Sequence, residues 1–316
     1  VAAGAAAARA RLDALDDGAR VEISRGTDRV VIPASVEDLA AVLLEHEKPT
    51  IVAGSTDVGL WITKFMRDIS PAVFTGGLKD FRGVTEGSEG LTLGGGASYD
   101  EAEAAITALF PHLAAYWQRI GGWQVRAMGT VGGNIANGSP IGDSPPALIA
   151  LDARVTLRRG DVRRDLALED FFIAYGKQDR KPGEFVETVF VPRPPEGALD
   201  AAYKVTKRRD EDISAVAAGF RVVVTDGIVT AARLAFGGMA ATPKRAAALE
   251  AALLGQPWTE ATVLAAAQAL AEDFTPLTDW RATADYRAAV ARNLLRRFFL
   301  ETSGADGARL ERRLAV

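Results

Sequence analysis

The sequence predicts an α+β protein made of two successive parts, and three observations indicate this fold class. Residues 28–80 alternate between strand and helix patterns, as in a small α/β unit. Residues 198–316 begin with strands on either side of Asp226-Gly227, a dipeptide typical of tight hairpins, and end with helices. Between the two parts, residues 193–197 (RPPEG) have the composition of a linker.

The first part begins with an alanine-rich segment, residues 1–20, which is expected to form a short helix or linker. Strands are expected at 28–33, 50–53 and 72–74. A helix follows the first strand because Ser35 can cap it and Asp38 stands three residues later. A second helix is expected to start at Ser55 or Thr56. These elements make up a subdomain of about residues 21–85.

A second subdomain is expected at about residues 86–197. It opens with a strand at 91–93 and a helix that starts at the capping box Ser98-Tyr99-Asp100-Glu101. Another helix is expected from Pro111 to Ile120. The stretch 121–146 is rich in glycine and shows little periodicity, so it is interpreted as a long loop, and a loop of this length in a compact domain is usually functional or misassigned. Three strands are expected to follow, at 154–157, 163–166 and 185–191.

The C-terminal domain, residues 198–316, is expected to contain an antiparallel sheet followed by helices. Strands are predicted at 203–206, 216–225 and 228–236. Helices are predicted after Thr242-Pro243, after Thr259-Glu260 and over 283–300.

Composition excludes several classes of function. The chain has 37 Lys and Arg against 41 Asp and Glu, a formal charge of −4, which does not favour a nucleic-acid or anionic-membrane partner. It has no cysteine, so it holds no disulfide, thiolate zinc site or cysteine-ligated iron–sulfur cluster. No apolar run approaches the length of a membrane span, and no signal peptide is recognised, so a cytoplasmic location is expected.

Two segments are candidates for ligand binding, and neither is a Rossmann, P-loop or G-x-S-x-G motif. In residues 51–58 (IVAGSTDV) an apolar strand turns sharply into a helix start. Backbone amides at such a turn can hold a pyrophosphate, although Ser and Thr at this place can also serve only as helix caps. In residues 129–140 (GTVGGNIANGSP) small residues allow a ligand close to the backbone, although such residues also mark ordinary surface loops.

Taken together, the order strand–AGSTD–helix, then TVGGN, then Ser-Pro and Asp143 resembles the flavin domain of the molybdenum hydroxylases. That family includes xanthine dehydrogenase, aldehyde oxidase and carbon monoxide dehydrogenase. The resemblance covers about residues 28–191, and residues 198–304 resemble the family's flavoprotein C-terminal domain. The AGSTDVGLWITK segment and residues 204–209 (KVTKRR) most resemble bacterial xanthine dehydrogenase small subunits. The implied fold is the two-subdomain FAD-binding fold shared with vanillyl-alcohol oxidase and p-cresol methylhydroxylase.

The resemblance implies a set of FAD contacts. The first segment would wrap the pyrophosphate and adenosine, the second would extend this cradle to the ribityl chain, and Asp143 would hold sugar or phosphate-proximal hydroxyls. Val186 would touch the ring system, Lys204 would reach its pyrimidine edge, and Ile120 replaces an aromatic residue of some relatives. The residues are Ile51, Val52, Ala53, Gly54, Ser55, Thr56, Asp57, Val58, Ile120, Thr130, Gly133, Asn134, Ala136, Asp143, Val186 and Lys204. No catalytic or metal-binding residue is expected.

The resemblance also implies partners. Purine hydroxylation would take place at a molybdopterin on a large subunit, and electrons would pass through two-iron iron–sulfur clusters to FAD and then to NAD⁺. The iron–sulfur domain would lie upstream on the same polypeptide or on a separate subunit of a hetero-oligomer. The alternatives are the flavin subunit of a carbon monoxide, aldehyde or heterocycle oxidoreductase, an assembly subunit with a decayed flavin site, and a stand-alone flavin oxidase. The last would need a substrate-side base, for which the sequence offers no candidate.

Overall fold

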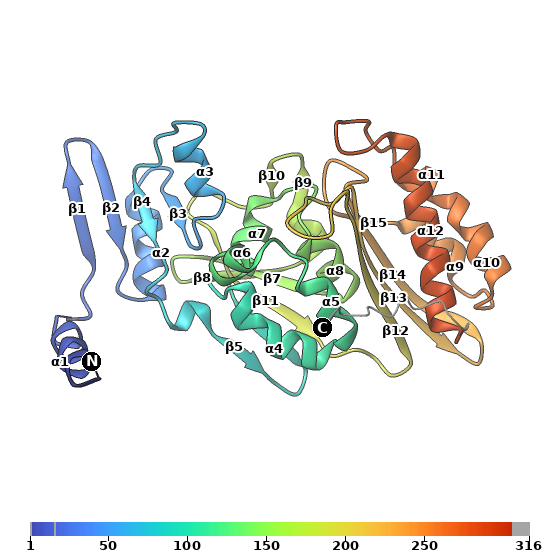
Figure 1. Ribbon diagram of the computed structural model, residues 1–316, viewed down its shortest axis with the longest axis horizontal. Helices are drawn as coiled ribbons and strands as arrows, with labels where there is room; N and C mark the ends of the chain where they lie inside the picture. Colours follow the sequence, from blue (N-terminus) through green and yellow to red (C-terminus); the bar gives the residue numbers. More distant parts are fainter. Residues whose placement is uncertain (1, 16, 305–316) are drawn as a thin grey trace.

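The computed structural model describes residues 2–15 and 17–304 and confirms the α+β class (Figure 1). Its larger sheets succeed one another along the chain, in the orders β1-β2-β4-β3, β5-β6-β11-β7-β8 and β12-β13-β14-β15. The helix α1 (Ala2–Asp13) lies at the far end of the molecule beside the β1–β2 hairpin. Within the described residues, no helix combines the length and apolar character that a bilayer crossing requires.

The N-terminal subdomain has the predicted alternation of strands and helices. Its elements are β1 (Val21–Arg25), β2 (Asp28–Ile32), α2 (Val36–Glu45), β3 (Thr50–Val52), α3 (Val58–Thr63) and β4 (Ala72–Phe74). The strands β2, β4 and β3 are parallel, so the carboxyl ends of β3 and β4 lie side by side. Strand β1 was not predicted and pairs antiparallel with β2. All five of its side chains are exposed, so it has no buried face from which a strand pattern could be recognised.

The second subdomain is built on a five-stranded antiparallel sheet. Its strands are β5 (Val84–Glu86), β6 (Gly90–Gly94), β7 (Arg154–Arg159), β8 (Val162–Ala167) and β11 (Phe185–Pro192), with a small pair formed by β9 (Phe172–Ala174) and β10 (Lys177–Gln178). Helix α4 (Tyr99–Leu109) starts at the predicted capping box, since Ser98 and Glu101 make both reciprocal hydrogen bonds. The helix expected from Pro111 to Ile120 is shorter, a 3₁₀ turn η2 (Pro111–Leu113) followed by α5 (Ala114–Trp117).

The prediction that residues 121–146 form a long loop is wrong. The segment contains α6 (Trp123–Met128), α7 (Val131–Asn137) and the start of α8 (Ser144–Ala150). Its glycines allow close packing as well as turns: a Cβ atom at Gly132, inside α7, would lie 2.4 Å from the carbonyl oxygen of Gly95. A helix that needs glycine for a close backbone approach lacks the apolar periodicity that sequence reading relies on.

The C-terminal domain confirms the predicted hairpin and the helices that follow it. Its elements are β12 (Ala198–Val205), β13 (Val216–Thr225), β14 (Ile228–Gly237), β15 (Lys244–Arg245), α9 (Ala247–Leu253), α10 (Glu260–Ala266), η4 (Ala267–Ala269), α11 (Leu270–Asp273) and α12 (Ala284–Thr302). These helices cover one side of the sheet in Figure 1. The other side packs on α8, where a Cβ atom at Gly219 would lie 2.4 Å from the carbonyl oxygen of Pro146.

Arginine side chains of the C-terminal sheet form hydrogen bonds with the second subdomain. Arg221 donates to the carbonyl oxygen of Leu151 at 3.3 Å, and Arg233 donates to that of Ile149 at 3.0 Å. Arg233 also bonds Glu169 at 2.7 Å, beside Arg245. Both carbonyl groups lie at the C-terminal end of α8, and the guanidinium groups add hydrogen bonds to them across the domain boundary; the Ile149 oxygen also accepts from the Asp152 amide at 3.0 Å.

Candidate functional site

The two segments singled out in the sequence meet in the structure. A Cβ atom at Gly54 would lie 1.9 Å from the carbonyl oxygen of Met128, so the loop after β3 packs directly on the end of α6. The adjoining Ser55 has a left-handed backbone, with φ 57°. Further along, Asn137 Nδ2 donates to Asp57 Oδ2 at 3.1 Å. The residues 53–57 and 128–137 therefore form one continuous site across the boundary between the two subdomains.

The second segment is held in place by its own polar side chains. Thr130 caps α7, with Oγ1 accepting from the Gly133 amide at 3.0 Å. Asn134 Oδ1 accepts a 2.7 Å hydrogen bond from Ser144 Oγ, and that hydroxyl lies 3.0 Å from the hydroxyl of Tyr99. Burial raises the pKa of Tyr99, which is therefore a neutral hydroxyl at physiological pH. This network fixes α7 relative to α4 and α8.

A cavity of about 70 Å³ lies where these loops meet. Small residues and backbone form much of its wall, which consists of Ala53, Thr75, Gly76, Arg82, Gly96, Ser98, Ala127, Met128 and Thr130. Thr75 is only 1% exposed, and its Oγ1 has no hydrogen-bond partner within the described residues. Arg82 bonds Glu101 at 2.7 Å and the Gly76 carbonyl oxygen at 3.1 Å. The cavity wall therefore includes glycine backbone and a threonine whose buried hydroxyl has no partner within the described residues.

Sequence reading missed Thr75, Gly76, Arg82 and Gly96. Thr75 and the glycines had a usable signal: Thr75-Gly76-Gly77 follows β4 and Gly94-Gly95-Gly96 ends β6, and glycine runs at strand ends often allow a ligand to approach the backbone. Arg82 had none, because an isolated arginine is usually a surface residue.

Asp143 and Lys204, which lie in different domains, form a buried ion pair. The Lys204 side chain is 2% exposed and that of Asp143 is 11% exposed. Ser214, which is fully buried, donates a 2.6 Å hydrogen bond to Asp143 Oδ1. The hydroxyl of Tyr116 donates to the backbone carbonyl of Asp143 at 2.5 Å. The loop before α8 is thus held from both domains.

The other predicted residues occupy separate places around this region. Val186 lies in β11 at the edge of the same packing, since a Cβ atom at Gly95 would be 2.1 Å from its carbonyl oxygen. Ile120 is 5% exposed and belongs to the core of the second subdomain, against which Ala136 also packs. Ile51 and Val52 lie in β3, and Val58 opens α3. Ile120 is not among the described residues that line the cavity.

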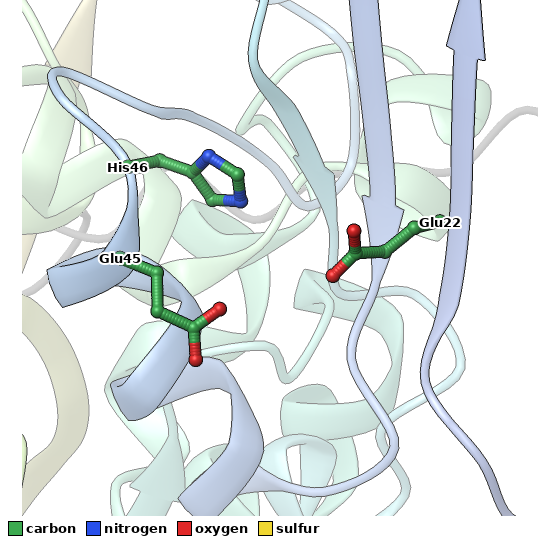
Figure 2. Close-up of side chains that lie close together, drawn as sticks. All are labelled: Glu22, Glu45 and His46. Atoms are coloured by element: carbon green, nitrogen blue, oxygen red, sulfur yellow. The ribbon is translucent and has the colours of Figure 1, made fainter.

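Glu22, Glu45 and His46 lie close together at the outer end of the N-terminal subdomain (Figure 2). Both carboxylates already bind the guanidinium group of Arg20, at 3.2 Å for Glu22 and 2.5 Å for Glu45. The same guanidinium contacts Asp38. A cation there would have to displace an arginine, so we assign no metal site to this cluster.

Comparison with known proteins identifies the family. Residues 23–194 match the FAD binding domain in molybdopterin dehydrogenase, and residues 201–302 match the CO dehydrogenase flavoprotein C-terminal domain. The chain belongs to the molybdopterin dehydrogenase FAD-binding family. This confirms both the resemblance inferred from the AGSTD and TVGGN segments and the expected two-part FAD-binding fold.

Individual relatives agree with this membership. Nicotinate hydroxylase hnxS of Emericella nidulans is 31% identical over 85% of the chain, which spans only 22% of that protein. The putative xanthine dehydrogenase FAD-binding subunit XdhB of Escherichia coli K12 is 27% identical over 88% of the chain and 97% of its own length. The solved carbon monoxide dehydrogenase of Hydrogenophaga pseudoflava, described as lacking the Mo-pyranopterin moiety, contains a similar chain. It has a TM-score of 0.80 and 27% identity over 87% of this chain and 96% of that one.

The residues present fit an FAD of this family. At Gly54 and Gly132 a Cβ atom would collide with the backbone of the facing segment, so glycine lets the segments around the cavity pack directly on one another. Thr75 supplies a buried hydroxyl without a protein partner, and buried polar groups are normally hydrogen-bonded. The cavity volume of about 70 Å³ is small compared with whole-ligand pockets of about 300–1,000 Å³, so it suits one portion of a dinucleotide.

Proposed function

We propose that the chain is the FAD-binding electron-transfer component of a molybdenum hydroxylase of the xanthine dehydrogenase type. The observation that carries this proposal is the meeting of residues 53–57 with residues 128–137 beside a cavity lined by Thr75, whose buried hydroxyl has no partner within the described residues. Family membership makes FAD the ligand that this junction would accept. The full-length relationship to XdhB, a putative xanthine dehydrogenase FAD-binding subunit, supports the choice of enzyme type.

In this proposal the chain's residues bind and orient FAD and none of them acts as an acid or base. Backbone and side chains of Ile51 to Val58 would hold the pyrophosphate and adenosine. Thr130, Gly133, Asn134 and Ala136 would continue the cradle toward the ribityl chain. The remaining contacts would come from Ile120, Asp143, Val186 and Lys204. Because the Lys204 ammonium group is paired with the Asp143 carboxylate, the two side chains together would offer FAD hydrogen-bonding groups with little net charge.

FAD supplies redox chemistry, since it can accept electrons singly from an iron–sulfur cluster and release them in pairs to an acceptor such as NAD⁺. Cysteine thiolates usually hold such clusters, and this sequence has no cysteine. The clusters would therefore belong to an iron–sulfur domain upstream or on another subunit, and the molybdopterin to a large subunit. We place the resulting hetero-oligomer in the cytoplasm, with xanthine as the substrate oxidised at the molybdopterin.

A second candidate is the flavin component of a heterocycle hydroxylase that acts on a pyridine acid. The observation that favours it is the 31% identity to a nicotinate hydroxylase. The chain would then bind FAD in the same way, and only the substrate oxidised on the partner would differ. The fold alone does not discriminate between these substrates.

The test is to purify the native complex that contains this chain, identify the released cofactor and record its visible spectrum with substrate. We expect the released cofactor to be FAD. We also expect xanthine to bleach the flavin absorbance of the complex, with NADH formed when NAD⁺ is present. Bleaching by nicotinate and not by xanthine would support the second candidate. Bleaching by xanthine without NADH would remove NAD⁺ as the acceptor. A well-folded complex without flavin would overturn both candidates and favour an assembly role.

A further inference from the structure

Thr75 occupies the first position after β4, where the carboxyl ends of two parallel strands lie side by side. Its backbone is fully engaged: the amide donates to the Val52 carbonyl oxygen at 3.1 Å, and its own carbonyl accepts from Leu78 at 3.0 Å. The residue is 1% exposed. Of the whole residue, only the hydroxyl has no partner within the described part of the chain.

A buried hydroxyl without a hydrogen bond destabilises a fold, and valine of nearly the same shape would remove this penalty. Threonine at position 75 therefore lowers the stability of the FAD-free chain relative to valine. Thr75 lines the 70 Å³ cavity together with Ala53 and Thr130, residues of the two segments that build the candidate site. The same wall includes Gly76 and Gly96, where backbone rather than side chain faces the space.

We propose that Thr75 is a direct ligand of the bound dinucleotide, with its Oγ–H donating to an oxygen of the diphosphate or the adjoining sugar alcohol. The inference rests on the proposed function, because it takes FAD as the occupant. The oxygen-rich middle portion of FAD suits a wall that includes glycine backbone, Thr75 and Arg82. Nothing in the sequence motifs assigns this residue to the site.

The test compares three full-length chains: wild type, Thr75→Val and Thr75→Ser. Each is freed of FAD, and two quantities are measured, the Kd for added FAD by fluorescence titration and the midpoint of thermal unfolding without FAD. Thr75→Val is expected to raise the Kd about five- to tenfold, as loss of one hydrogen bond does. Thr75→Ser keeps the hydroxyl and is expected to stay within about twofold of wild type.

Unfolding of the FAD-free chains separates ligand binding from structural damage. Thr75→Val is expected to unfold at the same temperature as wild type or higher, because it removes an unsatisfied polar group. Equal Kd values for wild type and Thr75→Val would overturn the proposal and assign the hydroxyl to a trapped water molecule instead. A lower unfolding temperature for the FAD-free valine variant would also overturn it. A wild-type chain that binds no FAD would refute the proposed function itself.

Discussion

Gly54 contacts the Met128 carbonyl group so closely that a Cβ atom at position 54 would lie 1.9 Å from the oxygen. Real Cβ atoms do not approach a carbonyl oxygen to this distance, so any side chain must push the two segments apart. The same Cβ atom would lie 2.9 Å from the Cα atom of Gly129, whereas a Cβ atom at Gly129 would reach the facing loop only at Thr56, 3.6 Å away. The distance between the two loops of the site is therefore set by glycine at position 54.

Gly54→Ala is expected to weaken FAD binding at least tenfold and to lower the free energy of unfolding by about 1–3 kcal/mol, as overpacking at rigid backbone contacts does. Gly59→Ala is a matched control in the adjacent helix α3. Its Cβ would meet only Ser55 Oγ at 3.5 Å, an ordinary contact, and alanine is a better helix former than glycine. The Kd for FAD and urea unfolding curves of both variants give the comparison. Equal effects of the two substitutions would refute the close contact as the cause.

The second prediction concerns the stability that depends on the ion pair between Asp143 and Lys204. Lys204→Met would leave the Asp143 carboxylate with 11% exposure, bonded to Ser214 but without its cation. Removing one partner of a buried pair typically costs about 3–5 kcal/mol of stability. The FAD-free chain is the right material, because urea unfolding then reports the pair without any contribution from a ligand.

A surface pair supplies the control for this prediction. Arg193 and Glu86 lie 2.5 Å apart, but their side chains are 43% and 53% exposed, so Arg193→Met should cost less than about 1 kcal/mol. The double variant Asp143→Asn with Lys204→Met should recover part of the loss, because no unpaired charge remains. Additive losses in the double variant would show that the two side chains do not act as a pair.

The contrast between elements predicted and missed has a physical basis. Ser35 and Ser98 marked their helices correctly because a cap and its partner lie within four residues, which is local information. The hairpin at Asp226-Gly227 was equally local. The helix α7 was missed because Gly132 serves a contact with Gly95, which lies far away in sequence. A single sequence carries no direct signal for such long-range packing.

The same reasoning applies to the site. The AGSTD and TVGGN segments were recognisable as motifs, and the structure brings them together. The pairing of Asp143 with Lys204 and Ser214 depends on how the C-terminal sheet packs against α8, so no local pattern could have indicated it. Thr75 lies outside both motifs and was found only through its burial and its unpartnered hydroxyl.

His112 makes a prediction about pH. It lies in η2 at the boundary with the C-terminal domain, in edge contact with Phe110, with Asp200 and Arg221 as the charged groups facing it. Burial is the main cause that lowers its pKa to about 4 from the ordinary 6.5; Arg221 lowers the pKa further, and Asp200 opposes the shift. The folded protein therefore keeps the imidazole neutral at pH values where the unfolded chain protonates it.

The sign of the effect follows from proton binding. Below about pH 6.5 His112 binds a proton in the unfolded state but not in the folded state, so lowering the pH favours unfolding. This effect continues until His112 is also protonated in the folded state, near pH 4. The loss should reach about 2–3 kcal/mol at pH 4, because each pKa unit corresponds to about 1.4 kcal/mol. The substitution His112→Gln removes the contribution of histidine protonation. The free energy of unfolding of this variant should therefore fall less steeply than that of wild type between pH 6.5 and pH 4. The carboxylates are common to both chains, so their titration cancels in the difference. Urea unfolding of both chains at half-unit steps of pH measures this difference, and parallel curves would show that His112 is not held neutral by burial.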